Sequence, residues 1–267
     1  MATDIKSLRT RMKSVDSTLH LTKAMGLVAS SKIRRANIAM QKSKEYSLAL
    51  EQILDLITSS DECAKSPFIR GNSTGKTKLI VIAGDRGLAG GYNANVFREA
   101  KKHSDADIIA IGKRSYERYK GEYFSSEHFS YTDSGKLAKK LCAEYLNNQF
   151  DKLGIIYTKY ISMMTQNAVV EWILPLKRGT KSNSSVLFEP DEAAILNTAV
   201  AEYLTGKINF AVRESFACEV AARRMAMDSA GKNASEMLDN LQLEYNRARQ
   251  GAITQEITEI VAGSGGE

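Results

Sequence analysis

Proline is scarce in this sequence, and its placement predicts two long helices. The 267 residues include 3 prolines, and none falls within residues 1–66 or 191–267. Because proline removes a backbone donor and breaks helix interiors, both ends of the chain can form uninterrupted helices. The 43% hydrophobic and 25% charged content is ordinary for a globular protein and excludes a disordered polymer.

Cysteines and long apolar runs are also few. Cys63, Cys142 and Cys218 are odd in number and far apart, which argues against a disulfide framework and a CxxC metal site. We therefore expect reduced thiols. No apolar run approaches the roughly 18 residues that a membrane-spanning helix needs. The first residues, MATDIKSLRT, lack the apolar stretch of a signal peptide, so we expect no export.

Catalytic motifs are missing too. The three histidines, His20, His103 and His128, have no Cys, Asp or second His at a spacing typical of a metal site or a catalytic triad. The sequence contains no HExxH. We therefore predict no catalytic residue, no cofactor and no metal site.

Two glycine-rich segments resemble phosphate-binding loops only partly. In GNSTGKTK (71–78), Arg70 stands where a Walker loop needs glycine, and the segment precedes a strand instead of following one. We interpret it as a polar linker. GDRGLAGGYN (84–93) follows a strand but lacks the GxGxxG spacing and the acidic residue of a dinucleotide site. We interpret it as a tight turn whose glycines allow close packing. A nucleotide-dependent enzyme built on the middle of the chain remains an alternative.

Heptad repeats of small and apolar residues mark both ends. The N-terminal repeat occupies positions 5, 12, 19, 26, 33 and 40 and positions 8, 15, 22, 29 and 36. The C-terminal repeat comprises Met227, Ala234, Leu238, Leu241, Tyr245, Ala248 and Ala252. Alternating spacings of three and four place such residues on one stripe of a helix, as in a coiled coil. Small residues at 22, 26, 29 and 36 should let a partner helix come close, although an ordinary amphipathic helix has the same periodicity.

The expected fold is α/β, with a long antiparallel coiled coil of the two terminal helices and a Rossmann-like α/β domain between them. Helices over 3–57 and 207–262 would each extend about 80 Å. The first would end where the middle domain begins, and the second would start where that domain ends. Asp191 is the expected helix N-cap, and Gly206 the expected interruption. Strands are predicted over 78–83, 106–112, 152–161 and 167–176, and helices over 93–103 and 134–150, which favours a largely parallel sheet with an antiparallel extension. The predicted domains are 1–60, 75–190 and 191–267.

Positive charge is concentrated in the first 44 residues. They hold ten Lys and Arg against two Asp, a net +8 within a chain of net charge +6. Such a segment suits an acidic partner, although a solvated helix face is the simpler interpretation. DNA binding is disfavoured because the charge lies on the heptad segment itself, with no separate basic region. A free coiled-coil adaptor is a second alternative.

Three segments carry a resemblance to a known family. LTKAMGLVASSKIRRA (21–36), DRGLAGGYN (85–93) and the C-terminal stretch 214–263, which contains NRARQGAITQEITEI, resemble the γ subunits of F-type ATP synthases. The likeness extends over essentially the whole chain. It departs from the common family pattern at Ala89, where cysteine is frequent, and the sequence lacks the inserted cysteine pair of chloroplast members, so we expect no thiol regulation.

The resemblance implies a rotor without catalytic groups. The paired terminal helices would form a shaft inside a head of α and β subunits, and the α/β domain a foot that binds the ε subunit and the membrane ring of c subunits. The complex would contain one copy, bind no nucleic acid and lie peripherally on the cytoplasmic face of the bacterial plasma membrane, associated with the membrane through the c ring. Coupling to protons or sodium would turn the shaft.

The resemblance also implies contact residues. Those expected at the β-subunit catch loops and the bearing are Lys23, Met25, Arg249, Gln250, Thr254 and Ile257. Those expected to face acidic β-subunit levers are Lys32, Arg34 and Arg35. The foot contact is expected near Tyr203 and Thr205. A bare tip with Ile253, Ile257, Ile260 and Val261 would be an exposed apolar patch on the separate chain.

Overall fold

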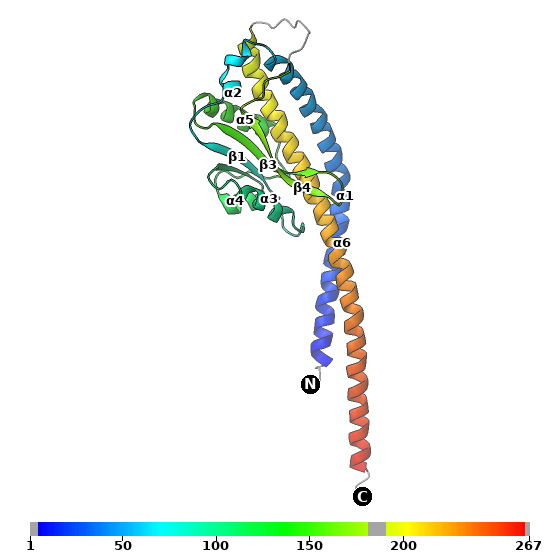
Figure 1. The fold of residues 1–267 in the computed structure, drawn as a ribbon. Helices are drawn as coiled ribbons and strands as arrows, with labels where there is room; N and C mark the ends of the chain where they lie inside the picture. Colours follow the sequence, from blue (N-terminus) through cyan, green and yellow to red (C-terminus); the bar gives the residue numbers. More distant parts are fainter. Residues whose placement is uncertain (1–4, 181–190, 265–267) are drawn as a thin grey trace. The chain divides into compact units, whose positions relative to one another are not determined.

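A computed structural model describes residues 5–180 and 191–264 (Figure 1). These residues pack as two compact units. The smaller unit comprises the described residues of 1–29 and 224–267, and the larger unit comprises 30–223. Each unit contains part of both terminal helices. The three-domain organisation expected from the sequence stays a prediction.

The two terminal helices are long and continuous. Helix α1 covers Ile5–Thr58 and helix α6 covers Glu192–Ser264. At a rise of 1.5 Å per residue they measure about 80 Å and about 110 Å. Asp191 caps α6 as expected, since its Oδ1 accepts a hydrogen bond from the backbone N of Ala194 at 2.7 Å. The cap satisfies a backbone donor that the first turn leaves without an intrahelical acceptor.

The predicted interruption at Gly206 is wrong. Helix α6 passes through this residue without a break. A Cβ placed on Gly206 would lie 2.5 Å from Cδ1 of Leu50 on α1. The glycine therefore allows two helices to approach each other, and this close packing holds the helix through a residue of low helix propensity.

In the smaller unit, α1 and α6 form the expected antiparallel pair. Buried positions recur every seven residues on α6, at Met227, Ala234 and Leu241. Gly26 lies opposite Met227, and Gly231 lies opposite Thr22, so residue numbers rise on one helix as they fall on the other. The predicted seam is confirmed from Met227 to Leu241, where its small residues hold the helices in close contact. Ala252, at the end of the predicted repeat, is exposed instead.

The larger unit contains a mixed four-stranded sheet of order β2-β1-β3-β4. The strands are β1 (Thr77–Ile82), β2 (Asp107–Ile111), β3 (Lys152–Tyr160) and β4 (Gln166–Leu174). Strand β1 pairs in parallel with both β2 and β3, and β4 pairs antiparallel with β3. This confirms the Rossmann-like sheet with an antiparallel extension.

Helices cover both faces of the sheet (Figure 1). One face packs with α5 (Tyr131–Leu146) and the first part of α6 in a large apolar core that includes Ile80, Ile155, Leu141, Leu204 and Ile208. The other face packs with α3 (Tyr92–Lys101) through Val96 and Ala100. Fully burying one such aliphatic side chain stabilises the fold by about 1.5–3 kcal/mol. The core therefore attaches α6 to the sheet over several turns.

Three short elements and one helix boundary differ from expectation. The short elements are a 3-10 turn at Cys63–Lys65, α2 (Pro67–Arg70) and α4 (Lys113–Tyr119). Helix α5 begins at Tyr131 because Ser130 and Asp133 form a reciprocal capping box ahead of the expected start.

Candidate functional site

The C-terminal end of α6 is an exposed apolar surface. Every side chain from 249 to 263 is exposed. The large apolar residues among them are 47–65% exposed and comprise Ile253, Ile257, Ile260 and Val261. We name these four residues the apolar tip. Contiguous exposed apolar side chains of this kind mark a surface that another protein covers.

Polar side chains flank the apolar tip. Arg249, Gln250 and Thr254 are all exposed on the same helix. The Thr254 hydroxyl donates to the carbonyl oxygen of Gln250 at 2.9 Å, a bond within the helix. The arginine and the glutamine thus offer hydrogen-bond donors on the surface beside the apolar tip.

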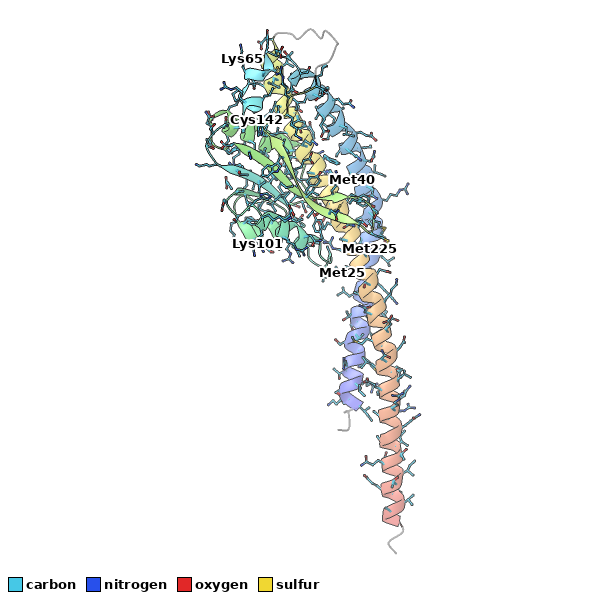
Figure 2. The ribbon with its side chains drawn as sticks, viewed as in Figure 1. Met25, Met40, Lys65, Lys101, Cys142 and Met225 are labelled. Carbon is cyan, nitrogen blue, oxygen red and sulfur yellow. The ribbon has the colours of Figure 1, made fainter. Side chains whose placement is uncertain are left out.

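Residues Lys23 and Met25 lie on α1 in the smaller unit. Lys23 is exposed, whereas Met25 is partly buried (labelled in Figure 2). The pair therefore presents one charge and one flexible apolar side chain, a composition that suits a surface with changing contacts.

The three residues of the basic cluster on α1, Lys32, Arg34 and Arg35, differ in exposure and in their partners. Arg34 and Arg35 are exposed, as expected for residues that face an acidic partner. Lys32 instead forms an ion pair with Glu127, and Arg86 lies 3.9 Å from the same carboxylate. The hydrogen bond from Lys32 holds the pKa of Glu127 below its ordinary value, against a smaller opposing effect of burial. The expectation that Lys32 faces an acidic lever stays a prediction, although its ammonium already has a carboxylate partner inside the larger unit.

The two expected foot residues differ in exposure. Tyr203 is partly buried, and burial raises its pKa to about 12. Thr205 is 3% exposed, and its hydroxyl donates to the carbonyl oxygen of Ala201 at 2.7 Å. The expectation of a surface contact through the Thr205 side chain is corrected, since this side chain lies in the interior against Gly135 of α5.

Asp85, in the segment 84–93, accepts several hydrogen bonds from other segments, a role that the sequence analysis did not predict. The Asp85 carboxylate accepts hydrogen bonds from Lys113 N at 2.9 Å, Glu127 N at 3.0 Å and Ser125 Oγ at 2.6 Å. Burial raises the pKa of this carboxyl, but these hydrogen bonds outweigh burial and hold it below the ordinary value. These hydrogen bonds hold the loop that carries Glu127 in place and so position the ion-pair partner of Lys32.

Helix α6 closes over the same turn. A Cβ on Gly84 would lie 2.7 Å from Cδ of Glu219. Arg223 donates to Glu219 Oε1 at 2.6 Å and to the carbonyl oxygen of Gly87 at 3.2 Å. These contacts support the interpretation of the segment as a turn for close packing, with Gly84 making room for a helix side chain. No local pattern in the sequence signals this contact, because Arg223 is 136 residues from Gly87.

The other glycine-rich segment binds a carboxylate of the chain itself. Backbone N of Thr74 and of Gly75 both donate to Asp151, as does the Thr74 hydroxyl at 2.7 Å. The amides that would cradle a phosphate in a Walker loop therefore have an internal acceptor. This agrees with a connecting role for residues 71–78 and ties the linker to the residue that precedes β3.

The described part of the chain contains neither a metal-binding cluster nor a membrane-spanning helix. Within residues 5–180 and 191–264, no group of three or more His, Cys, Asp or Glu side chains is arranged to hold a metal ion. Across the same ranges, no helix has the length and hydropathy needed to cross a bilayer. All three cysteines are buried, and burial raises the pKa of the Cys142 thiol to about 11.

Comparisons with solved structures find the same fold in ATP synthase complexes. A chain of the Euglena gracilis mitochondrial ATP synthase (OSCP/F1/c-ring, rotational state 3) matches with a TM-score of 0.68 and 16% identity over 97% of this chain and 93% of that one. A chain of the Tetrahymena thermophila mitochondrial ATP synthase (central stalk/c-ring) matches with a TM-score of 0.61 and 19% identity over 79% of this chain and 99% of that one. At these identities the likeness shows the fold.

Sequence comparisons establish the family. The model of a family described as "ATP synthase" matches residues 4–265. The ATP synthase gamma chain of Alkaliphilus metalliredigens is 36% identical over 285 residues, 99% of both chains. That of Ruminococcus albus is 37% identical over 281 residues, 98% of both. The chain therefore belongs to the ATP synthase gamma-chain family.

Proposed function

We propose that this chain is the central-stalk rotor subunit of an F-type ATP synthase. It passes turning force between a membrane ring of c subunits and the three catalytic β subunits during ATP synthesis and hydrolysis. One observation carries the proposal: gamma chains of ATP synthases match this chain over 99% of its length and of theirs. The two continuous terminal helices, paired in antiparallel along a small-residue seam, supply the stiff element that a rotor needs.

The apolar tip is proposed as the bearing. Covering a large aliphatic side chain that is half exposed contributes about 1 kcal/mol, and the tip holds four such residues, each 47–65% exposed. Apolar contact is non-directional, so a sleeve of α and β subunits gains this stabilisation at every angle. Contacts with the β-subunit catch loops and the bearing are proposed for Lys23 and Met25 on α1 and for Arg249, Gln250, Thr254 and Ile257 on α6.

The exposed part of the basic cluster is proposed to face acidic levers of the β subunits. Arg34 and Arg35 are exposed, and exposed ion pairs contribute about 0–1 kcal/mol each. Weak, screened pairs form and break easily as a surface turns. Lys32 acts indirectly, since its pair with Glu127 joins α1 to the loop between α4 and α5.

The foot is proposed to bind the ε subunit and the c ring near Tyr203, whose side chain is partly exposed. Thr205 supports this surface from inside. The complex would contain one copy of the chain and lie on the cytoplasmic face of a bacterial plasma membrane, with attachment to the membrane through the c ring.

The proposed mechanism depends on the asymmetry of the pair of terminal helices. Two helices of unlike sequence present a different surface to each β subunit, so the three catalytic sites differ in affinity. Rotation driven by a proton or sodium gradient takes each site in turn through binding, synthesis and release, and hydrolysis reverses the order. A partner surface can shift the state of a site only through contacts that differ between its states.

A reversible cross-link tests the proposal. Arg249→Cys is paired with a cysteine in the β-subunit catch loop of the assembled complex, and the three native cysteines are buried and do not compete. Oxidation should stop multisite ATP hydrolysis, and dithiothreitol should restore it. The complex with Arg249→Cys alone controls for oxidation damage. Undiminished turnover in the cross-linked complex would show that rotation of this part of α6 is unnecessary.

Two further measurements separate the alternatives. A nucleotide-dependent enzyme on the α/β domain predicts that the isolated chain binds ATP or NAD in calorimetry, whereas the rotor predicts no binding of functional affinity. A free coiled-coil adaptor predicts purification without α and β subunits, whereas the rotor predicts that they purify together with it.

A further inference from the structure

Lys207 lies where four elements of the larger unit meet. Its ammonium Nζ is 2.7 Å from Oε1 of Glu171 on β4 and forms a second ion pair with Glu51 on α1. The other oxygen of Glu171 accepts a hydrogen bond from the Tyr157 hydroxyl of β3 at 2.8 Å. The lysine itself is on α6, and its side chain is 9% exposed. These four residues, Lys207, Glu51, Glu171 and Tyr157, are named the lysine joint.

The adjacent residue brings the two long helices together at this place. Gly206 leaves no room for a Cβ, because Leu50 of α1 lies where one would project. Glu51 follows Leu50 on α1, just as Lys207 follows Gly206 on α6. The closest approach of the helices and the charged link between them therefore come from neighbouring residues.

The charges in the joint are held in place. Burial alone would lower the pKa of Lys207, but the two carboxylates outweigh burial and keep the pKa above its ordinary value. The lysine therefore stays charged across the physiological pH range. Hydrogen bonds between oppositely charged groups are shorter and stronger than those between neutral groups.

Most of the other contacts between α6 and the sheet are made by aliphatic residues such as Leu204, Ile208 and Ile155. Two backbone amides of β3 also donate to α6, from Thr158 N to Ser215 Oγ at 3.2 Å and from Tyr160 N to Glu214 Oε1 at 3.0 Å, but neither hydrogen bond involves α1. Apolar contact resists separation but depends little on direction, so it opposes sliding weakly. The lysine joint opposes sliding because any shift of the sheet along the helix pair lengthens its charged hydrogen bonds.

We propose that Lys207 is the positioning residue that locks the sheet of the foot to both long helices, so that turning force passes between them with little internal slip. The proposal rests on the rotor function above and names the part of the foot that carries the load. Without the lysine, the two carboxylates of Glu51 and Glu171 would face each other without a cation between them.

The chain offers a matched control in Lys78. This lysine lies on β1 with 13% of its side chain exposed, and it also pairs with two carboxylates, Glu144 at 2.7 Å and Asp107 at 3.3 Å. Both partners belong to the α/β domain, on α5 and β2, and neither belongs to α1 or α6. Lys78→Met therefore removes a comparable buried charge without touching the connection to the long helices.

The experiment compares Lys207→Met with Lys78→Met in the assembled complex. The head is immobilised, a bead is attached to the foot at Lys113→Cys on the exposed face of α4, and the angular fluctuation of the bead is recorded between steps. Lys207→Met should broaden this fluctuation, and Lys78→Met should leave it at the wild-type width. Amide exchange in α1 around Glu51 should rise about tenfold in Lys207→Met alone, which corresponds to about 1.4 kcal/mol of lost local stability.

Equal fluctuation in the wild type and Lys207→Met would overturn the proposal, as would equal broadening in both variants. If Lys207→Met fails to assemble, Glu51→Gln replaces it, because this change weakens only the link to α1 and leaves the Lys207–Glu171 pair intact. A broader fluctuation in Glu51→Gln supports the joint, and an unchanged one refutes it. Absence of any ATP-driven rotation in the wild type would instead refute the proposed function, so the two failures are distinguishable.

Discussion

Glu214 gives the sharpest prediction of a pH-dependent stability. This residue of α6 is 5% exposed. Its Oε1 accepts a hydrogen bond from the backbone N of Tyr160 at 3.0 Å, whereas Oε2 is buried and has no hydrogen-bond partner among the described residues. Burial raises the pKa of Glu214, and neither the Tyr160 amide nor the nearby Lys159 and Lys44 reverse this.

The sign of the effect follows from proton binding. A folded-state pKa above the unfolded value of about 4.3 means that the folded chain binds the proton more tightly. Ionised Glu214 therefore lowers the free energy of unfolding at pH values above its folded-state pKa. This penalty disappears as the pH falls below the unfolded value.

Glu214→Gln removes the charge and keeps an oxygen that can accept from Tyr160. The amide NH2 takes the place of the unpartnered Oε2, and an unsatisfied buried group costs more when it is charged than when it is neutral. The variant should therefore be more stable than the wild type near pH 8, by about 1–3 kcal/mol. For a domain of this size, that gain corresponds to a rise in Tm of about 2–10 °C. Near pH 4.5 the difference should shrink toward zero.

Thermal unfolding followed by circular dichroism at a series of pH values measures the difference. Glu122→Gln, a change at an exposed glutamate of the same unit, serves as the control and should shift the Tm little at any pH. A difference between Glu214→Gln and the wild type that stays constant with pH, or a destabilised variant at pH 8, would refute the reasoning.

Three further predictions address the turns, the thiols and the tip. Gly112→Ala should lower the free energy of unfolding by about 3 kcal/mol or more, because the φ of Gly112 is +93° and a Cβ would lie 1.9 Å from the carbonyl oxygen of Ala83. Gly121 has a similar φ of +94° but open space around it, so Gly121→Ala should cost only about 1–3 kcal/mol. Urea titrations of both variants measure the difference. Dithiothreitol should leave the ATPase activity of the complex unchanged, since the cysteines are buried, and a rise on reduction would contradict this. Ile257→Ser should leave the Tm of the isolated chain unchanged, because the Ile257 side chain is already 56% exposed. The same change should weaken the binding free energy between this chain and the head by about 1 kcal/mol in reconstitution assays. An unchanged affinity would argue against a bearing at this residue.

The sequence predicts the long helices and the sheet well because both depend on local periodicity. The seven-residue spacing of Met227, Ala234 and Leu241 determines which face of α6 is buried. The alternation of apolar strands with helices determines the order of the α/β domain. Asp191 is recognisable as a cap because capping acts over three residues.

Features that depend on distant residues are not predictable in this way. Lys32 shares the first 44 residues with nine other Lys and Arg residues, but its partner, Glu127, is 95 residues away in the sequence. Gly206 is predicted to interrupt the helix because of its low helix propensity, and only the structure shows that Leu50 of α1 packs against it. Thr205 lies in a segment that resembles a contact surface, but the fold places it against α5. The residues proposed to meet the head subunits depend on other chains, and resemblance is their only guide in the sequence.

Rotation of the foot relative to the head is the most direct test of the rotor function. With the α and β subunits fixed to a surface and a bead on Lys113→Cys of α4, addition of ATP should turn the bead in one direction for many revolutions. A bead that stays in place while the same complexes hydrolyse ATP would contradict a rotor role for this chain.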